Sequence, residues 1–269
     1  MKQPQNQPIG VFDSGLGGLS VLHHLKAQLP AENLIYVGDS AHVPYGSKST
    51  DFICERSFVI SDFLVREGCK ALVIACNTAT AAAAGALRAR YTLPIIGMEP
   101  AVKPAVQHSH NKIIGVLATE GTLKSAQFAA LLDRFGQDVH VVTQPCPGLP
   151  ELVEAGELNT PATRQLLQHY MQPLKQAGVD TIVLGCTHYP FLAPLIQDMA
   201  GAEVVLIDTG TAVARHTKDR LTAIGQLNPD SVPGQARCYS SLATPAAEAV
   251  VSRLWGTPVI LSAFPESNA

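Results

Sequence analysis

Ala71-Leu-Val-Ile-Ala-Cys-Asn-Thr-Ala-Thr80 is the stretch around which the rest of the chain is best interpreted. It opens with apolar residues, as in a strand buried on both faces of a parallel sheet. The alanines at 81–84 then favour a helix, with Asn77 or Thr78 as its N-cap. We therefore expect Cys76 between a strand end and a helix N-terminus, where ligands bind in open α/β sheets and a thiolate is stabilised. An inert core thiol explains this stretch alone equally well, because free cysteines are often buried.

The composition is that of a compact globular protein. The chain has 269 residues, 46% of them hydrophobic and 15% charged, enough for a core that needs no disulfide or metal. The 19 basic and 22 acidic residues form no basic block, so neither nucleic acid nor an anionic membrane is expected as a partner. No apolar run approaches the ~18 residues of a membrane span, and the polar residues 1–8 lack the apolar core of a signal peptide.

The cysteines are scattered along the chain, at Cys54, Cys69, Cys76, Cys146, Cys186 and Cys238. None forms a Cys-x-x-Cys pair, so we expect neither a disulfide framework nor a metal site. Unpaired thiols indicate a reducing cytoplasm.

Strands and helices alternate along the chain. Strands are expected at 9–12, 34–37, 71–75 and 94–96, and again, after a break at 97–100, at 113–117, 139–142, 181–184, 204–207 and near Cys238. Helices are expected between them, including one unbroken helix from about Thr119 to Phe135 and one at 246–254. This order predicts an α/β fold with mainly parallel sheets flanked by helices.

The second half of the chain echoes the first. Ile9-Gly-Val-Phe12 matches Ile114-Gly-Val-Leu117, and Leu72-Val-Ile-Ala-Cys76 matches Ile182-Val-Leu-Gly-Cys186 at a similar offset. We therefore expect two similar lobes related by pseudo-twofold symmetry, with the carboxyl ends of their sheets facing one cleft. Each lobe would present one thiol to that cleft, from opposite sides.

A glycine-rich turn, Asp13-Ser-Gly-Leu-Gly-Gly18, follows the first predicted strand. With Asp39 about twenty residues on, it approaches the dinucleotide fingerprint Gly-x-Gly-x-x-Gly, but Ser20 stands at the third glycine position. Two other interpretations are a plain βα turn whose glycines supply positive φ, and an anion site made by turn amides and the Ser14 hydroxyl. A nucleotide-dependent oxidoreductase using Gly15 is thus the alternative function, and a two-lobed binding protein without chemistry is a third.

Cys76 and Cys186 together indicate proton transfer at a stereocentre. One thiolate removes a proton while the other thiol donates one from the opposite side, and thiols can be tuned to titrate near pH 7. A nucleophilic Cys186 beside His188 is also conceivable, but it leaves Cys76 idle. Asp13 is a candidate acid or base for Cys76, and Glu154 and His188 for Cys186. Asp13 could instead form the turn, and Glu154 could be a solvated helix residue.

Neutral hydrogen-bond donors accompany the two thiols. They are Ser14, Tyr45, the amide of Gly46, Asn77, Thr78 and Thr187. Such a set suits a small zwitterion that carries a carboxylate. The other histidines show no ligand spacing with cysteines.

Taken together, these motifs resemble the glutamate racemases of the aspartate/glutamate racemase superfamily. The matching stretches are 11–18, 38–46, 75–79, 97–100, 152–154 and 184–190. The resemblance implies an isomerase that interconverts L- and D-glutamate without a cofactor and supplies D-glutamate for peptidoglycan. It also implies a first lobe of residues 1–98 plus 209–269 and a second lobe of residues 99–208.

The resemblance assigns roles to individual residues as well. Cys76 would act on the D-glutamate face with Asp13, and Cys186 on the L-glutamate face with Glu154 and His188. Substrate contacts would come from Asp13, Ser14, Tyr45, Gly46, Asn77, Thr78, Thr187 and His188. Family members are often homodimers with differing interfaces, so a homodimer is one option here.

Overall fold

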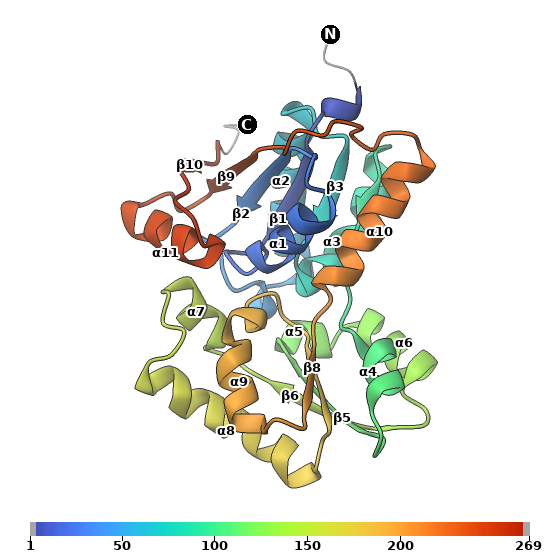
Figure 1. The fold of residues 1–269 in the computed structure, drawn as a ribbon, viewed down its shortest axis with the longest axis vertical. Helices are drawn as coiled ribbons and strands as arrows, with labels where there is room; N and C mark the ends of the chain where they lie inside the picture. Colours follow the sequence, from blue (N-terminus) through green and yellow to red (C-terminus); the bar gives the residue numbers. More distant parts are fainter. Residues whose placement is uncertain (1–3, 266–269) are drawn as a thin grey trace.

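The computed structural model describes residues 4–265, and Figure 1 shows that they form two α/β lobes. The upper, first lobe holds a six-stranded sheet in the order β10-β9-β2-β1-β3-β4, and the lower, second lobe holds a four-stranded sheet in the order β6-β5-β7-β8. All strand pairs in both sheets are parallel. The prediction of two parallel sheets flanked by helices is therefore confirmed.

The first lobe contains both ends of the described chain. Its strands are β1 (Ile9–Asp13), β2 (Leu34–Gly38), β3 (Ala71–Ile74), β4 (Ile95–Ile96), β9 (Ala236–Ser240) and β10 (Leu261–Ala263). Its helices are α1 (Leu19–Gln28), α2 (Thr50–Arg66), α3 (Asn77–Arg90), α10 (Gly210–Ala223) and α11 (Pro245–Trp255), with short 3₁₀ turns at Pro4–Asn6 and Tyr45–Ser47.

The second lobe is built from one continuous part of the chain. Its strands are β5 (Ile113–Ala118), β6 (His140–Pro145), β7 (Thr181–Leu184) and β8 (Val205–Ile207). Its helices are α4 (Val102–His108), α5 (Glu120–Leu123), α6 (Ala126–Phe135), α7 (Leu149–Glu154), α8 (Pro161–Ala177) and α9 (Ala193–Ala200), with a 3₁₀ turn at Tyr189–Leu192.

The two sheets repeat one topology, as the duplicated sequence motifs predicted. The order β2-β1-β3-β4 in the first lobe corresponds to β6-β5-β7-β8 in the second. The registers agree too, since Gly10 lies beside Leu72 and Gly115 beside Ile182. The chain crosses between the lobes after β4 and after β8, and the C-terminal strands β9 and β10 extend the first sheet. The lobe boundaries at 98/99 and 208/209 stay a prediction.

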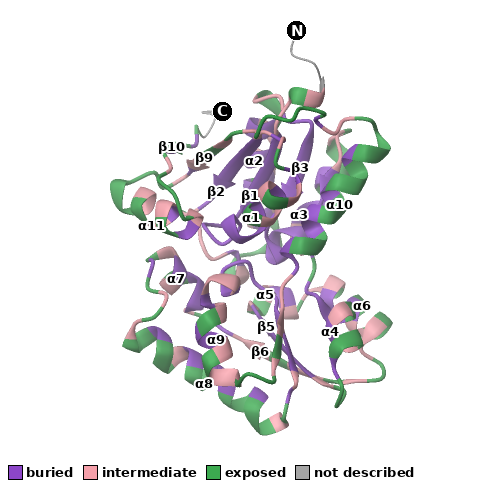
Figure 2. Ribbon diagram, viewed as in Figure 1, coloured by how far each residue is buried: buried purple, intermediate pink, exposed green. Residues whose placement is uncertain are grey.

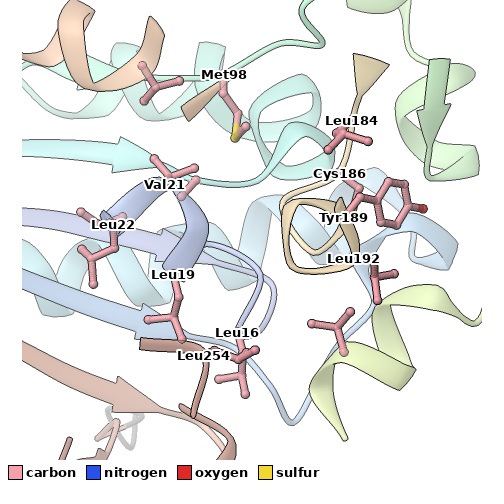
Figure 3. Close-up of a cluster of buried hydrophobic side chains, with 14 of the residues drawn as sticks. Leu16, Leu19, Val21, Leu22, Met98, Leu184, Cys186, Tyr189, Leu192 and Leu254 are labelled. Carbon is pink, nitrogen blue, oxygen red and sulfur yellow. The ribbon is translucent and has the colours of Figure 1, made fainter. Parts of the chain in front are cut away.

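Buried apolar side chains from both lobes pack together in one core cluster. Every residue of β1, β2 and β3 is buried, and Figure 2 shows the central strands as buried throughout. One core cluster contains Leu16 and Leu19 of the first lobe together with Tyr189 and Leu192 of the second, and Figure 3 shows these side chains together. This shared core fixes how the carboxyl ends of the two sheets face each other.

Three local predictions were wrong. The helix expected over 119–135 is two helices, because Ser125 accepts a hydrogen bond from the Phe128 amide and begins α6 anew. The N-cap of α3 is neither Asn77 nor Thr78 but Cys76. Strand β10 was not predicted, because it has only three residues, which pair with β9 from Leu261 beside Cys238 onward.

No helix among residues 4–265 is both long and apolar enough to cross a lipid bilayer.

Candidate active site

The two predicted thiols line a single cavity between the lobes. Cys76 follows β3 and Cys186 follows the equivalent strand β7, so both stand at carboxyl ends of parallel strands, where α/β proteins bind ligands. The cavity is lined by Ser14, Pro44, Tyr45, Gly46, Cys76, Asn77 and Thr78 of the first lobe and by Thr119, Thr122, Pro150, Gly185, Cys186, Thr187 and His188 of the second. The space in which the centre of a water molecule fits is about 10 Å³, which is room for roughly one water. The two lobes are therefore closed over the site.

The surroundings of Cys76 favour the protonated thiol. Its Sγ caps α3 by accepting a hydrogen bond from the Ala79 amide (3.4 Å) and faces the Ser14 hydroxyl at 3.8 Å. Burial raises the pKa of the Cys76 thiol well above its ordinary value, and the negative charge of Asp13 raises it further, against the lowering effect of the two hydrogen bonds. The thiol is therefore suited to donate a proton.

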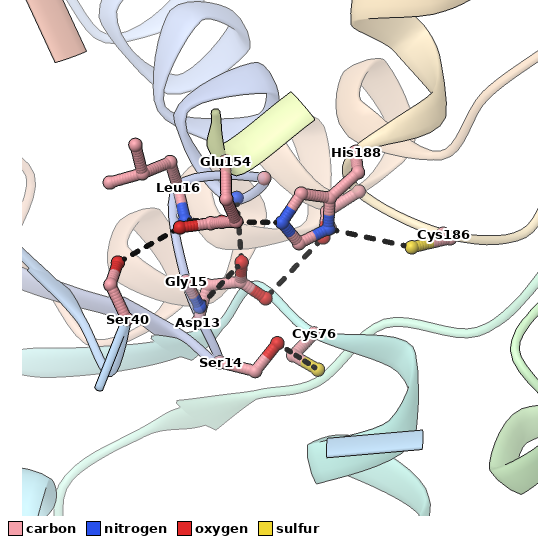
Figure 4. A network of polar contacts seen from close by, with 12 residues as sticks. Asp13, Ser14, Gly15, Leu16, Ser40, Cys76, Glu154, Cys186 and His188 are labelled. Atoms are coloured by element: carbon pink, nitrogen blue, oxygen red, sulfur yellow. Dashed lines mark hydrogen bonds and ion pairs between the residues drawn. The ribbon is translucent and has the colours of Figure 1, made fainter. Parts of the chain in front are cut away.

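Cys186 belongs to a hydrogen-bonded chain that Figure 4 shows. Its Sγ lies 3.6 Å from Nδ1 of His188, whose Nε2 lies 2.7 Å from Oε1 of Glu154. Burial lowers the pKa of His188, but the bonds to Cys186 and Glu154 outweigh it and raise that pKa well above its ordinary value. An imidazolium at this position stabilises a neighbouring thiolate, so Cys186 is placed to act as a base.

Asp13 is both a turn-forming residue and a neighbour of the reactive groups. Its Oδ2 accepts hydrogen bonds from the Gly15 amide (3.2 Å) and the Gly18 amide (3.0 Å), and its Oδ1 accepts one from the Thr187 hydroxyl (3.4 Å). Complete burial raises the pKa of Asp13, although His188 and the turn amides act in the opposite direction. The carboxyl group thus links the turn of the first lobe to the strand end of the second.

The glycine turn, residues 13–18, does not offer its amides to a phosphate. Asp13 occupies the Gly15 and Gly18 amides, and Glu154 occupies the Leu16 amide at 2.5 Å. The acid expected at a ribose, Asp39, is instead bound by Arg56 through two contacts of 2.9 Å. These contacts give no support to dinucleotide or anion binding at the turn.

The glycines of this turn are needed for space and not for backbone conformation. Neither Gly15 nor Gly17 has positive φ, so the expected conformational reason was wrong. A Cβ on Gly15 would overlap the carboxylate of Glu154, and one on Gly17 would lie 2.5 Å from Nδ1 of His188. The motif therefore lets the acid–base groups of the second lobe come close to the first.

Tyr45 lines the cavity, but its hydroxyl is already engaged. It donates to Asp39 at 2.6 Å, and Asp39 also lies 2.9 Å from Nδ1 of His42. This buried cluster holds the loop that carries Gly46. Any contact of Tyr45 with a ligand would therefore come from its ring or backbone.

Asn77 has the strongest signature of a ligand contact. Both Nδ2 and Oδ1 are buried without a hydrogen-bond partner, and such atoms typically cost about 1–3 kcal/mol each. The neighbouring Thr78 hydroxyl, in contrast, contacts Thr119 (2.9 Å) and Thr122 (3.1 Å). A ligand carboxylate and ammonium group would satisfy the Asn77 amide.

Three residues whose side-chain hydroxyls lie at the site were missed in the sequence. Thr119 and Thr122 line the cavity, and Ser40 donates to Glu154 at 3.1 Å. The duplication could have identified Thr119, because the match of Ile9–Phe12 with Ile114–Leu117 makes Thr119 the equivalent of Ser14. Among residues 4–265, no group of three or more His, Cys, Asp or Glu side chains is arranged to hold a metal ion.

Comparison with known proteins gives consistent matches. A model of the family described as Asp/Glu/Hydantoin racemase matches residues 9–217. The chain is 55% identical to glutamate racemase of Ectopseudomonas mendocina, over 98% of this chain and 100% of that protein, and 58% identical to that of Pseudomonas syringae pv. tomato, over 84% of each. The crystal structure of glutamate racemase isoform RacE1 from Bacillus anthracis superposes with a TM-score of 0.87 at 31% identity, covering 97% of this chain and 98% of that one. Glutamate racemase from Francisella tularensis in complex with D-glutamate gives 0.84 at 28% identity, covering 98% and 100%.

Proposed function

The chain belongs to the Asp/Glu/hydantoin racemase family and, within it, to the glutamate racemases, and we propose that it interconverts L- and D-glutamate by moving the Cα proton between two thiols. One observation carries the proposal: Cys76 and Cys186 follow equivalent strands of two like lobes and line one cavity. Because one thiol supplies the base and the other the acid, the proposed reaction needs no cofactor.

In the L-to-D direction, Cys186 starts as the thiolate and Cys76 as the thiol. The Cys186 thiolate takes the proton from Cα of L-glutamate, and the Cys76 thiol gives its proton to the opposite face of the carbon. The configuration inverts, and the thiol and thiolate have exchanged places. The D-to-L reaction, or proton exchange with solvent, restores the starting state.

Neighbouring side chains support each thiol in this scheme. We assign His188 and Glu154 to Cys186, because they form its hydrogen-bonded chain, and Asp13 to Cys76, whose pKa it raises. Substrate contacts are proposed for Asp13, Ser14, Tyr45, Gly46, Asn77, Thr78, Thr187 and His188. The unpartnered amide of Asn77 is the best supported of these contacts.

The wider setting follows from the family. D-glutamate made by this reaction would supply peptidoglycan synthesis. A cytoplasmic location is supported by the cysteines, all of which are free thiols. A homodimer stays a prediction that sedimentation of the purified protein would test.

Replacing either thiol tests the function directly. We expect Cys76→Ala and Cys186→Ala each to abolish racemisation of D-glutamate, followed by circular dichroism, so that no solvent deuterium appears at Cα of the opposite enantiomer. Cys54→Ala is the matched control, because Cys54 lies on α2 and its thiol donates to the carbonyl of Ala82, away from the cavity. Racemisation at the rate of the unmodified protein in either active-site variant would refute the mechanism.

A further inference from the structure

Glu154 is the carboxylate of the hydrogen-bonded series Glu154–His188–Cys186, and residues of both lobes bind it. It lies at the end of α7 in the second lobe, and its side chain is only 12% exposed. Within its own lobe it bonds to His188. From the first lobe it accepts hydrogen bonds from the Leu16 amide (2.5 Å) and the Ser40 hydroxyl (3.1 Å).

The two oxygens of this carboxylate have different partners, as Figure 4 shows. Oε1 accepts from Leu16 and contacts His188, while Oε2 accepts from Ser40. Rotation of the carboxylate about its last bond would break the contact with His188. The Ser40 hydroxyl opposes that rotation, because it fixes the oxygen that His188 does not use.

Ser40 is itself held firmly by its neighbours in the chain. The preceding Asp39 is completely buried and paired with Arg56. The amide of the following Ala41 donates to the Ser241 hydroxyl at 3.0 Å. Ser40 therefore presents its hydroxyl to Glu154 from a loop fixed on both sides.

We propose that Ser40 is a positioning residue that couples closure of the two lobes to the alignment of His188 with Cys186. When the lobes part to admit substrate, Glu154 loses its contacts with Ser40 and Leu16, since these belong to the other lobe. The chain Glu154–His188–Cys186 is then oriented only in the closed state, when substrate is enclosed. This inference rests on the proposed function, because it assigns Ser40 to the Cys186 half of the two-thiol reaction.

The inference predicts an effect on one of the two proton transfers. In Ser40→Ala, kcat/KM should fall about tenfold in both directions, the usual size for losing one hydrogen bond to a charged group. Because only the transfer at Cys186 slows, the primary isotope effect should rise with L-glutamate deuterated at Cα. With D-glutamate deuterated at Cα, the primary isotope effect should fall. Its labelled proton is removed at Cys76, and in the variant that step is followed by a slower transfer at Cys186, which then limits the rate.

Two further variants separate positioning from simple support of the fold. Ser40→Thr keeps the hydroxyl and should restore the isotope effects of the unmodified protein. Ser47→Ala removes another hydroxyl of the same loop, one that donates to the Pro44 carbonyl (3.4 Å) and not to Glu154, so it should leave the balance between the two isotope effects unchanged. Thermal unfolding of each variant confirms that the protein assayed is folded.

The outcomes distinguish the proposed function from the role of Ser40. If the unmodified protein does not racemise glutamate, the proposed function fails. If it does, and Ser40→Ala keeps its rate or changes both isotope effects in the same sense, only the role of Ser40 is overturned. The same conclusion follows if Ser47→Ala reproduces the opposite shifts of Ser40→Ala.

Discussion

Replacing Gly17 with alanine would push apart two surfaces that meet at the active site. An added Cβ would lie 2.5 Å from Nδ1 of His188 and 2.6 Å from the Thr187 hydroxyl. Ordinary contacts begin near 3.4 Å, so the imidazole would have to withdraw by about 0.9 Å. Since Gly17 does not have positive φ, its backbone accommodates alanine without strain, and the perturbation is confined to this contact.

The size of the effect follows from that displacement. A misplacement of about 1 Å in a catalytic group costs roughly a hundredfold in rate, which corresponds to about 2.7 kcal/mol. Overpacking of this kind costs about 1–3 kcal/mol of folding stability, and each kcal/mol lowers Tm by about 2–4 °C in a protein of this size. Gly17→Ala should thus stay folded at 25 °C while its kcat falls about a hundredfold.

The assay follows racemisation of glutamate by circular dichroism, with kcat and KM measured in both directions and Tm by thermal unfolding. Gly85→Ala is the matched control, because Gly85 is exposed on α3 and an added Cβ meets nothing within 4 Å. Alanine there should raise stability by about 0.5–1 kcal/mol and leave the rates unchanged. A folded Gly17→Ala protein with the kcat of the unmodified enzyme would refute the claim that these glycines make room for the acid–base groups.

Two more predictions concern the substrate amide and the imidazole. Asn77→Ala should raise KM at least tenfold with equal or slightly greater folding stability, because it removes buried polar atoms that lack partners; a loss of stability with unchanged KM would show a structural role instead. His188 has a folded-state pKa above its ordinary value of 6.5, so its stabilising contribution is complete below pH 6.5 and is lost as pH rises through the folded-state pKa. Urea unfolding from about pH 6 to about pH 9 should therefore show the stability gap between the unmodified protein and His188→Gln shrinking as pH rises, and a gap that grows would contradict the assignment.

The position of the two thiols could be predicted from the sequence, because the local strand pattern and the topology of a parallel sheet lead to the same place. Cys76 and Cys186 follow matching apolar strands, and parallel strands align their carboxyl ends, so their shared cavity could be predicted. The glycines of the turn at 13–18 were expected to supply positive φ, but they make room for Glu154 and His188. The sequence of a glycine turn does not reveal which distant side chain will fill the space beside it. No role could be predicted for Ser40, because its hydrogen bond to Glu154 forms only when folding brings the two lobes together.

The return of the C-terminal segment to the first lobe affects how the protein can be synthesised. Strand β9 covers the edge of β2, pairing Ala236 with Leu34, whereas all strands of the second lobe lie within residues 113–207. On the ribosome the second lobe can finish folding while β2 still has an open edge, which could pair with other nascent chains and aggregate. Truncation before residue 236 should leave that edge permanently uncovered, even though every residue lining the active-site cavity would still be present.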